Sequence, residues 1–199
     1  MMKQSEKIIH LISDSIGLKQ SLLQDEKLIN TIDELANQIT YCFKKNGKLI
    51  ICGNGGSASD ALHFAGEIVG RFQKERKAWP AVVLNSDVAT MTAIANDYGY
   101  DEVFARQVEG HIRPGDVFIG ISTSGNSENV YRAMLKAKEF GAKTVCLSGK
   151  DGGKIGREAD YVIIVPSSVT ARIQECHIMI IHIICELVEN ALSKTEINE

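Results

Sequence analysis

The sequence has few of the features that would set it apart from ordinary soluble proteins. Its 199 residues include only 3 prolines and 6% aromatic residues, and Lys plus Arg number 22 against 25 for Asp plus Glu. A protein that neutralises nucleic-acid phosphates usually carries a basic surplus, so the net charge of −3 argues against general nucleic-acid binding. The same net charge is only weak evidence against the binding of a small anionic substrate. With 44% hydrophobic residues, the chain is neither disordered nor a disulfide-stapled miniprotein.

Long apolar segments and export signals are also lacking. The longest apolar stretch, residues 178–185 with His182 inside it, falls short of the roughly 18–20 residues that span a bilayer. The N-terminal residues mix acids and bases and contain neither an apolar run nor a small-residue cleavage site. Five cysteines form an odd set without C-x-x-C, and most stand in apolar runs, as reduced core thiols do. We therefore expect a cytoplasmic protein without a membrane span.

Hydrophobic periodicity divides the chain into helices and strands. Apolar residues recur at helical spacing from 5 to 43 with a polar break at 24–26, which predicts two leading helices. Short apolar runs and helical patterns then alternate, which predicts a parallel sheet covered by helices on both faces, an α/β three-layer sandwich. The predicted strands are 48–53, 81–84, 116–122, 143–148 and 161–165. The predicted helices between them are 58–73, around 87–95, 101–110 and 128–140.

The last predicted element, from about 171 to 192, is a long helix whose middle is apolar nearly all round. Such a helix must be buried on more than one side. In a domain of this size it is buried more readily between subunits than within one, so we expect a homo-oligomer. No repeat or linker divides the chain. We predict one domain over 1–199, with N-terminal helices (1–45) used in oligomerisation and an α/β core over 46–195.

A glycine-rich turn follows the first predicted strand, which ends at Gly53, and leads into a helix that Ser57 or Ser59 would open. Glycines let backbone amides approach a ligand, and a helix start offers unpaired N–H groups. The segment is neither G-x-G-x-x-G nor a Walker loop, and glycine in such turns is often purely structural. Both interpretations stay open on these residues alone.

A second turn, after the strand 116–122, is rich in hydroxyl groups. Ser122, Thr123, Ser124 and Ser127 stand at the mouth of the next helix, where hydroxyls and helix N–H groups can form a phosphate cradle without a lysine. A capped helix is the alternative, but one hydroxyl suffices for a cap, so four favour a ligand. In a doubly wound sheet, the two turns would flank the crevice where strand order reverses.

Histidines and acids recur on two of the predicted helices. His63 and Glu67 are four residues apart, so their side chains share one helix face at about 6 Å, which in isolation suggests only a surface pair. Gln174, His177 and His182 lie in or beside the apolar stripe of the last helix, where a buried histidine needs a partner such as a metal or substrate. Gln174 and His182 are about 12 Å of helical rise apart. Joint ligation would need a neighbouring subunit, or a helix that begins after Gln174.

Five segments carry a family resemblance in combination, although none is specific alone. They are GNGGSASDALHFAGE at 53–67, NDYGY at 96–100, ISTSGNS at 121–127, LSGKDGGK at 147–154 and RIQE-x-HI-x-x-x-H at 172–182. Together they resemble the phosphoheptose isomerases of the SIS (sugar isomerase) fold, whose five parallel strands follow a flavodoxin-like order. The resemblance implies an intramolecular oxidoreductase that interconverts sedoheptulose 7-phosphate and D-glycero-D-manno-heptose 7-phosphate through an enediol, at the first step of nucleotide-activated heptose biosynthesis. It also implies a homotetramer with active sites at subunit interfaces and one Zn²⁺ per subunit.

The resemblance assigns roles to individual positions. It implies zinc ligation by His63, Glu67, Gln174 and His182. It implies substrate contacts from Asn54, Gly55, Gly56, Ser57, His63, Glu67, Asn96, Asp97 and Gln174, with the phosphate held by Ser122, Thr123, Ser124 and Ser127. Glu67 is the candidate catalytic base and His182 the partner acid. Ala171 departs from relatives that have an acidic residue there, which leaves any contribution of that position open.

Three other functions compete with this prediction. A structural nucleotide-binding domain is disfavoured by the lack of a dinucleotide fingerprint and of an acidic residue at the end of the second predicted strand. A non-catalytic SIS-fold tetramer that binds a protein partner, such as a replication initiator, is disfavoured by the intact His63, Glu67, Gln174 and His182. An isomerase of another phosphosugar is disfavoured by the R-I-Q-E-x-H-I run. The residues do not distinguish a lipopolysaccharide, capsule or surface-layer pathway, nor the anomer of the heptose.

Overall fold

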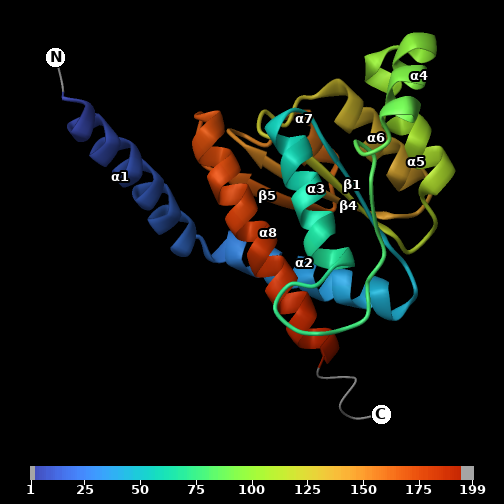
Figure 1. Cartoon of the computed structure of the whole chain (residues 1–199), viewed down its shortest axis with the longest axis horizontal. Coiled ribbons are helices and arrows are strands. Elements are labelled where there is room, and N and C mark those ends of the chain that lie inside the picture. Colours follow the sequence, from blue (N-terminus) through green and yellow to red (C-terminus); the bar gives the residue numbers. More distant parts are fainter. Residues whose placement is uncertain (1–2, 194–199) are drawn as a thin grey trace.

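A five-stranded parallel sheet forms the centre of the computed structural model, which describes residues 3–193 (Figure 1). The strand order β2-β1-β3-β4-β5 reverses between β1 and β3, so the predicted flavodoxin-like order is confirmed. Each strand lies within one residue of its predicted bounds. The strands are β1 (Leu49–Gly53), β2 (Ala81–Val83), β3 (Val117–Ser122), β4 (Lys143–Gly149) and β5 (Tyr161–Val165). Positions 194–195 of the predicted core lie outside the described residues, as do the other residues of both chain ends.

The helices follow the predicted pattern with two differences. Asp25 stands in the polar break between the two leading helices, and its carboxylate accepts the N–H of Leu28 to cap the second. A short helix at 153–158 was missed, because glycines around its start resemble a turn. The helix expected over 58–73 begins at Gly56 and ends at Val69. The helices are α1 (Gln4–Leu23), α2 (Glu26–Lys44), α3 (Gly56–Val69), α4 (Val88–Tyr98), the 3₁₀ turn η1 (Tyr100–Glu102), α5 (Ala105–His111), α6 (Glu128–Glu139), α7 (Gly153–Glu158) and α8 (Thr170–Ser193).

Two hydrophobic cores lie on opposite faces of the sheet, because successive strand residues point to opposite sides. On β1, Leu49 and Ile51 belong to the core shared with α2, α3 and α8, whereas Ile50 and Cys52 belong to the core shared with α4, α5 and α6. Each fully buried aliphatic side chain contributes roughly 1.5–3 kcal/mol relative to an exposed one. The predicted three layers are confirmed. All five cysteines are free and buried, as predicted.

Helix α8 packs against α2 and α3 and completes one face of the sheet (Figure 1). By length and composition alone this helix is apolar enough to cross a membrane, which the count of consecutive apolar residues did not reveal. Half of its most apolar window is nevertheless buried inside the fold, as in a core helix. Ile183 and Leu187 on its outer side are exposed by 40% and 38%. The helix is therefore buried on two sides, with an apolar strip left at the surface of the single chain.

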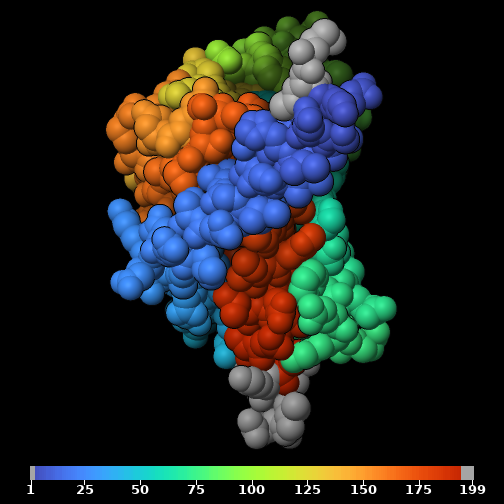
Figure 2. Space-filling view, turned by 90° about the vertical axis from the view of Figure 1, so that its left-hand side faces the viewer, coloured from blue at the N-terminus to red at the C-terminus, as the bar shows by residue number. Residues whose placement is uncertain are grey.

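Helix α1 presents apolar side chains to the surface. It lies with α2 diagonally across α8 (Figure 2), and Leu22 near its end is its single buried residue. An apolar groove of about 400 Å³ lies between α1, α2 and α8. The exposed apolar residues of α1 include Ile8, Ile9, Leu11, Ile12 and Ile16. In a single chain this apolar surface is in contact with water, which is unfavourable in free energy. Association with another chain would bury the surface.

Candidate active site

Three side chains that could bind a metal meet where α3 packs against α8. The Nε2 atom of His63 lies 3.1 Å from Oε1 of Glu67 and 2.9 Å from Nε2 of His182. One ligand atom from each residue lies within 4.8 Å of the other two, and all three side chains retain some exposure to solvent. Phe72 covers one side, with its ring centre 5.8 Å from that of His182.

Helix periodicity brings this cluster together. Phe64 and Ile68 on α3 point into the core, which leaves His63 and Glu67 one turn apart on the flank that faces α8. His182 follows the buried Ile181 on α8 and reaches that same flank. Two imidazole nitrogens and one carboxylate oxygen are a donor set that suits zinc. The chemistry and spacing of these residues therefore fit a divalent ion.

Gln174 lies at the other end of α3, two helical turns from His182. A Cβ added to Gly56 would stand 2.2 Å from the side-chain Nε2 of Gln174, so the amide lies directly against the start of α3. Helix α8 already begins at Thr170, so the suggestion that it starts after Gln174 is wrong. Ligation by Gln174 in the same site as His182 stays a prediction.

An open hollow of about 420 Å³ extends from Gln174 to His63. Asp60 lines it, and within the described residues its Oδ2 atom is buried without a hydrogen-bond partner. Burial raises the pKa of this carboxyl, an effect that the neighbouring His63 partly opposes. Sequence reasoning missed Asp60, although it stands three residues before His63 on the same helix. Ala171, the position where some relatives are acidic, lines the same hollow.

The hydroxyl-rich turn forms a connected loop at the end of β3. Ser122 Oγ lies 2.9 Å from Ser127 Oγ and 3.4 Å from Ser124 Oγ, and Ser124 Oγ also accepts the N–H of Asn126 at 3.1 Å. Ser127 occupies the N-cap position of α6, yet its side chain makes no capping hydrogen bond. The capped-helix alternative therefore accounts for little of this serine cluster, and the hydroxyls converge as a phosphate cradle requires.

This loop is fastened to the turn that follows β4. The carbonyl of Thr123 accepts the N–H of Gly149, and the carbonyl of Gly125 accepts that of Ile155 at 2.9 Å. Gly125 has a φ of +65°, and a Cβ there would stand 2.0 Å from the carbonyl oxygen of Gly152. Only glycine meets both conditions. The LSGKDGGK segment thus shapes the hydroxyl loop from behind.

Asn54 connects the turn after β1 to the hydroxyl loop. Its side chain exchanges two hydrogen bonds with that of the buried Asn129, at 2.9 and 3.0 Å, and accepts a third from the hydroxyl of Tyr100. Asn129 and Tyr100 were not among the predicted site residues. Tyr100 belongs to the NDYGY segment, and Asn129 stands two residues after Ser127, so proximity to those motifs was the available signal. The two loops do flank the reversal point between β1 and β3, as predicted.

The turn after β1 differs from the prediction in its helix cap. Gly55, with a φ of 55°, is the N-cap residue of α3, whereas Ser57 is buried inside the first turn and Ser59 lies further along. A Cβ on Gly53 would stand 2.6 Å from the Ser57 carbonyl, so strand and helix pack too closely for a side chain there. The expectation that a serine opens α3 is therefore wrong. Close packing requires the glycine at 53, and the positive φ favours the glycine at 55, so part of the glycine-rich turn is structural.

Asn96 and Asp97 lie in the last turn of α4. Both are exposed, and the side-chain amide of Asn96 donates to Asp97 at 2.8 Å. Among the described hydrogen bonds, Tyr100 is the residue of this segment that reaches the β1 turn. Contacts from Asn96 and Asp97 to a sugar stay predictions.

Several curated proteins with extensive sequence similarity to this chain carry one name. A SIS domain family model matches residues 18–149. The phosphoheptose isomerase of Sulfurimonas denitrificans is 47% identical over 187 residues, which cover 94% of this chain and 96% of that protein. The enzyme of the same name from Helicobacter pylori is 54% identical over 173 residues, covering 87% and 85%.

Solved structures agree with the sequence comparisons. The structure of phosphoheptose isomerase from Neisseria gonorrhoeae superposes with a TM-score of 0.89 at 41% identity, and covers 94% of this chain and 100% of that one. A phosphoheptose isomerase from Francisella tularensis gives a TM-score of 0.90 at 34% identity, with 95% and 100% covered. Sequence and fold together place this chain in the phosphoheptose isomerase family of SIS-domain proteins.

Proposed function

We propose that this chain is an aldose–ketose isomerase that interconverts sedoheptulose 7-phosphate and D-glycero-D-manno-heptose 7-phosphate, in heptose biosynthesis. The observation that carries the proposal is the cluster of His63, Glu67 and His182, found in a member of this family. A carboxylate and two imidazoles within reach of one another supply the acid–base groups that such a reaction needs.

The reaction moves one proton from C1 to C2 and another from one oxygen to its neighbour, through an enediol. Glu67 takes the proton from the carbon and returns it to the adjacent carbon. His182 transfers the proton between the two oxygens, a role for which a partly exposed imidazole is suited because its ring nitrogens can both donate and accept a proton. The contacts of His63 Nε2 with the Glu67 carboxylate and with His182 Nε2 hold both side chains close to His63.

The same cluster is our proposed zinc site, with His63, Glu67 and His182 as ligands and Gln174 as the fourth, which a neighbouring subunit would supply because in one chain Gln174 lies against the start of α3. Zinc, when bound, polarises the carbonyl and hydroxyl oxygens of the substrate as a Lewis acid. Glu67 would then be both a ligand and the base, and its carboxylate has a second oxygen that could accept the proton.

The phosphate site we propose is the hydroxyl loop. Ser122, Ser124 and Ser127 already converge on one another, and Thr123 lies between them. The start of α6 adds N–H groups and the positive end of its dipole, so no lysine is required. Asn54, together with the backbone of Gly55, Gly56 and Ser57, would contact the sugar from the neighbouring turn.

We further propose that the working enzyme is a homotetramer whose active sites combine residues of different subunits. Glu67 lies about 16 Å of helical rise from Gly56, so the cluster and the turn beside the cradle lie at opposite ends of α3 in one chain. A second subunit can bring one of these sites to the other. The apolar surface of α1 supports such an association. The five buried, free thiols support a cytoplasmic location.

Incubation of the purified protein with sedoheptulose 7-phosphate, with and without a chelator, tests the proposed function. We expect formation of the aldose, its loss on chelation and its return with added Zn²⁺. Well-folded, zinc-loaded protein that produces no aldose would instead support the protein-binding alternative. Parallel incubations with other ketose phosphates test the alternative of a different phosphosugar.

A further inference from the structure

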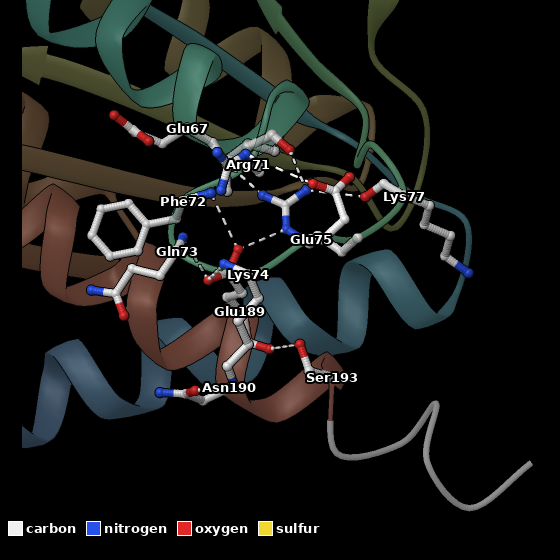
Figure 3. A network of polar contacts seen from close by, with 12 residues as sticks. Glu67, Arg71, Phe72, Gln73, Lys74, Glu75, Lys77, Glu189, Asn190 and Ser193 are labelled. Atoms are coloured by element: carbon white, nitrogen blue, oxygen red, sulfur yellow. Dashed lines mark hydrogen bonds and ion pairs between the residues drawn. The ribbon is translucent and has the colours of Figure 1, made fainter.

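A buried carboxylate on α8 holds the loop that connects α3 to β2, residues 70–80 (Figure 3). The side chain of Glu189 is 2% exposed and accepts hydrogen bonds from the N–H groups of Phe72, Gln73 and Lys74, at 3.2, 2.8 and 3.0 Å. The Nε atom of Arg76 adds a fourth bond at 3.0 Å. The loop is thus fixed to the C-terminal part of α8 through its backbone.

Arg76 carries the connection onward to the end of α3. Its guanidinium stacks 3.6 Å from the centre of the Trp79 ring and is as deeply buried as the Glu189 carboxylate. One terminal nitrogen donates to the carbonyl of Ile68, and the other donates to the carbonyl of Glu67 at 2.8 Å. The planar fork of arginine can make these bonds together, which a lysine cannot do.

The two residues therefore reach both halves of the proposed catalytic pair. Arg76 contacts the backbone of Glu67, and the loop held by Glu189 presses the ring of Phe72 against His182. Glu189 itself stands seven residues after His182, two turns along the same face of α8. Arg76, Glu189 and the loop 70–80 thus form a network next to the cluster of His63, Glu67 and His182. Neither Arg76 nor Glu189 is a member of that cluster.

Stability is a weak explanation for such an arrangement. Removing two charges from water costs several kcal/mol per ion, and well-packed apolar residues often stabilise a protein as well or better. A fully hydrogen-bonded pair does, however, fix a single geometry. We propose that Arg76 and Glu189 are positioning residues for the isomerase site, which hold α3 and α8 so that Glu67 and His182 act together. This inference rests on the proposed function and adds two residues to it.

The test compares Glu189→Gln with a matched control at Asp116, a second buried carboxylate, which immediately precedes β3. The buried carboxylate of Asp116 likewise accepts two backbone N–H groups, from Lys48 and Arg113, and pairs with the Lys48 ammonium at 2.6 Å. Asp116→Asn therefore removes a similar buried charge, whose described hydrogen-bond partners, Lys48 and Arg113, belong neither to the cluster nor to the loop 70–80. Each variant is assayed for unfolding temperature, for kcat and KM well below that temperature, and for Zn²⁺ affinity by competition with a chromophoric chelator.

We expect Glu189→Gln to lower kcat and Zn²⁺ affinity by at least about tenfold, as loss of supporting partners around a metal site does. KM of Glu189→Gln should change less than about twofold, because the phosphate loop lies near the start of α3 and the cluster near its end. Asp116→Asn should keep kcat and Zn²⁺ affinity while losing stability. The proposal is overturned if Glu189→Gln keeps both values near those of the unmodified chain, or if Asp116→Asn loses as much kcat. Arg76→Lys, which keeps the charge but not the fork, decides the question if Glu189→Gln does not fold.

Failure of the proposed function gives a different pattern. If the unmodified chain binds Zn²⁺ but does not convert sedoheptulose 7-phosphate, the proposed reaction is wrong, and Zn²⁺ affinity of the variants still decides the positioning role. If the unmodified chain neither turns over nor binds Zn²⁺, both proposals fall.

Discussion

The imidazoles of His63 and His182 face each other with their Nε2 atoms 2.9 Å apart. Only one of these nitrogens can carry the proton between them, so the other must act as the acceptor. Binding of a divalent ion would replace that proton and use both lone pairs. Metal binding and protonation therefore compete at this pair.

One Zn²⁺ per chain is expected, with an affinity that falls as the pH is lowered, because protons compete with a metal ion for the lone pairs of its ligands. His182→Ala should weaken binding by more than about 1.4 kcal/mol, which is tenfold. Metal analysis measures the number of Zn²⁺ ions per chain, and chelator competition measures the Zn²⁺ affinity. His111→Ala, at the end of α5, is the control and should bind Zn²⁺ normally; equal losses in the two variants would contradict the assignment.

Replacement of Glu67 by Gln should abolish turnover, because the amide cannot accept the carbon-bound proton. Substrate should still bind, since the phosphate loop is unchanged, and calorimetry together with bound-metal analysis separates these effects. Glu75→Gln removes an exposed carboxylate paired only loosely with Arg71, at 3.9 Å, and should remain active. Near-normal activity of Glu67→Gln would refute its role as base.

Loss of the Ser124 hydroxyl should weaken phosphate binding. Ser124→Ala removes one hydrogen bond to a charged group, worth about 1–3 kcal/mol, and should raise KM with a smaller effect on kcat. Thr31→Ala provides the control, because that hydroxyl donates only to the carbonyl of Lys27 on α2. An unchanged KM for Ser124→Ala would remove the residue from the phosphate site.

The buried His177 should make folding stability depend on pH. Burial lowers its pKa from 6.5 to about 4, although a hydrogen bond with the carbonyl of Ser148 opposes the shift. The unfolded chain thus binds the proton more tightly than the folded chain. The contribution of the neutral His177 to folding stability is therefore complete above pH 6.5 and is lost as pH falls toward 4. The loss approaches about 3 kcal/mol.

Urea unfolding of the chain and of His177→Gln, compared between pH 7.5 and 5, tests this dependence. The glutamine amide can still donate to Ser148 but does not titrate, so the variant should lose less stability over that range. An equal decrease in the free energy of unfolding between pH 7.5 and 5 in the two proteins would show that His177 does not cause the loss.

The apolar surface of α1 should mediate association. Ile12, which is 56% exposed in the single chain, is our target, and Ile12→Asp should yield smaller species in light scattering coupled to size-exclusion chromatography. Burial of a carboxylate in an apolar interface without a partner is strongly unfavourable. Leu135→Asp, on α6 on the other face of the sheet, should leave the assembly intact. An unchanged mass for Ile12→Asp would exclude this surface as the interface.

Periodicity predicted the sheet well because both faces are covered, which makes each strand a continuous apolar run that polar turns delimit. Helix boundaries were less accurate where backbone packing decided them. Gly55 rather than a serine caps α3, since Ser57 is drawn into the packing around Gly53. Helix α7 was hidden for a related reason, as its first residues adopt conformations that the sequence associates with turns.

Site residues were predictable where they share an element and less so where folding joins distant segments. His63 and Glu67 followed from helical spacing, and the hydroxyl loop followed from its density of serines. The meeting of His63 with His182, 119 residues later, required the packing of α3 on α8. Arg76 and Glu189 gave no signal at all, because a single arginine and a single glutamate 113 residues apart resemble surface charges until the loop is in place.

Helix α8 is the last described element to be synthesised, yet it supplies a large share of the core on its side of the sheet. Until it leaves the ribosome, the sides of α2 and α3 that α8 covers, and the parts of β4 and β5 that it contacts, lack this apolar partner. The opposite core, built from residues before about 165, can form earlier. Nascent chains of this protein therefore expose apolar surface on this side of the sheet until α8 has been synthesised, and are good clients for chaperones during that interval.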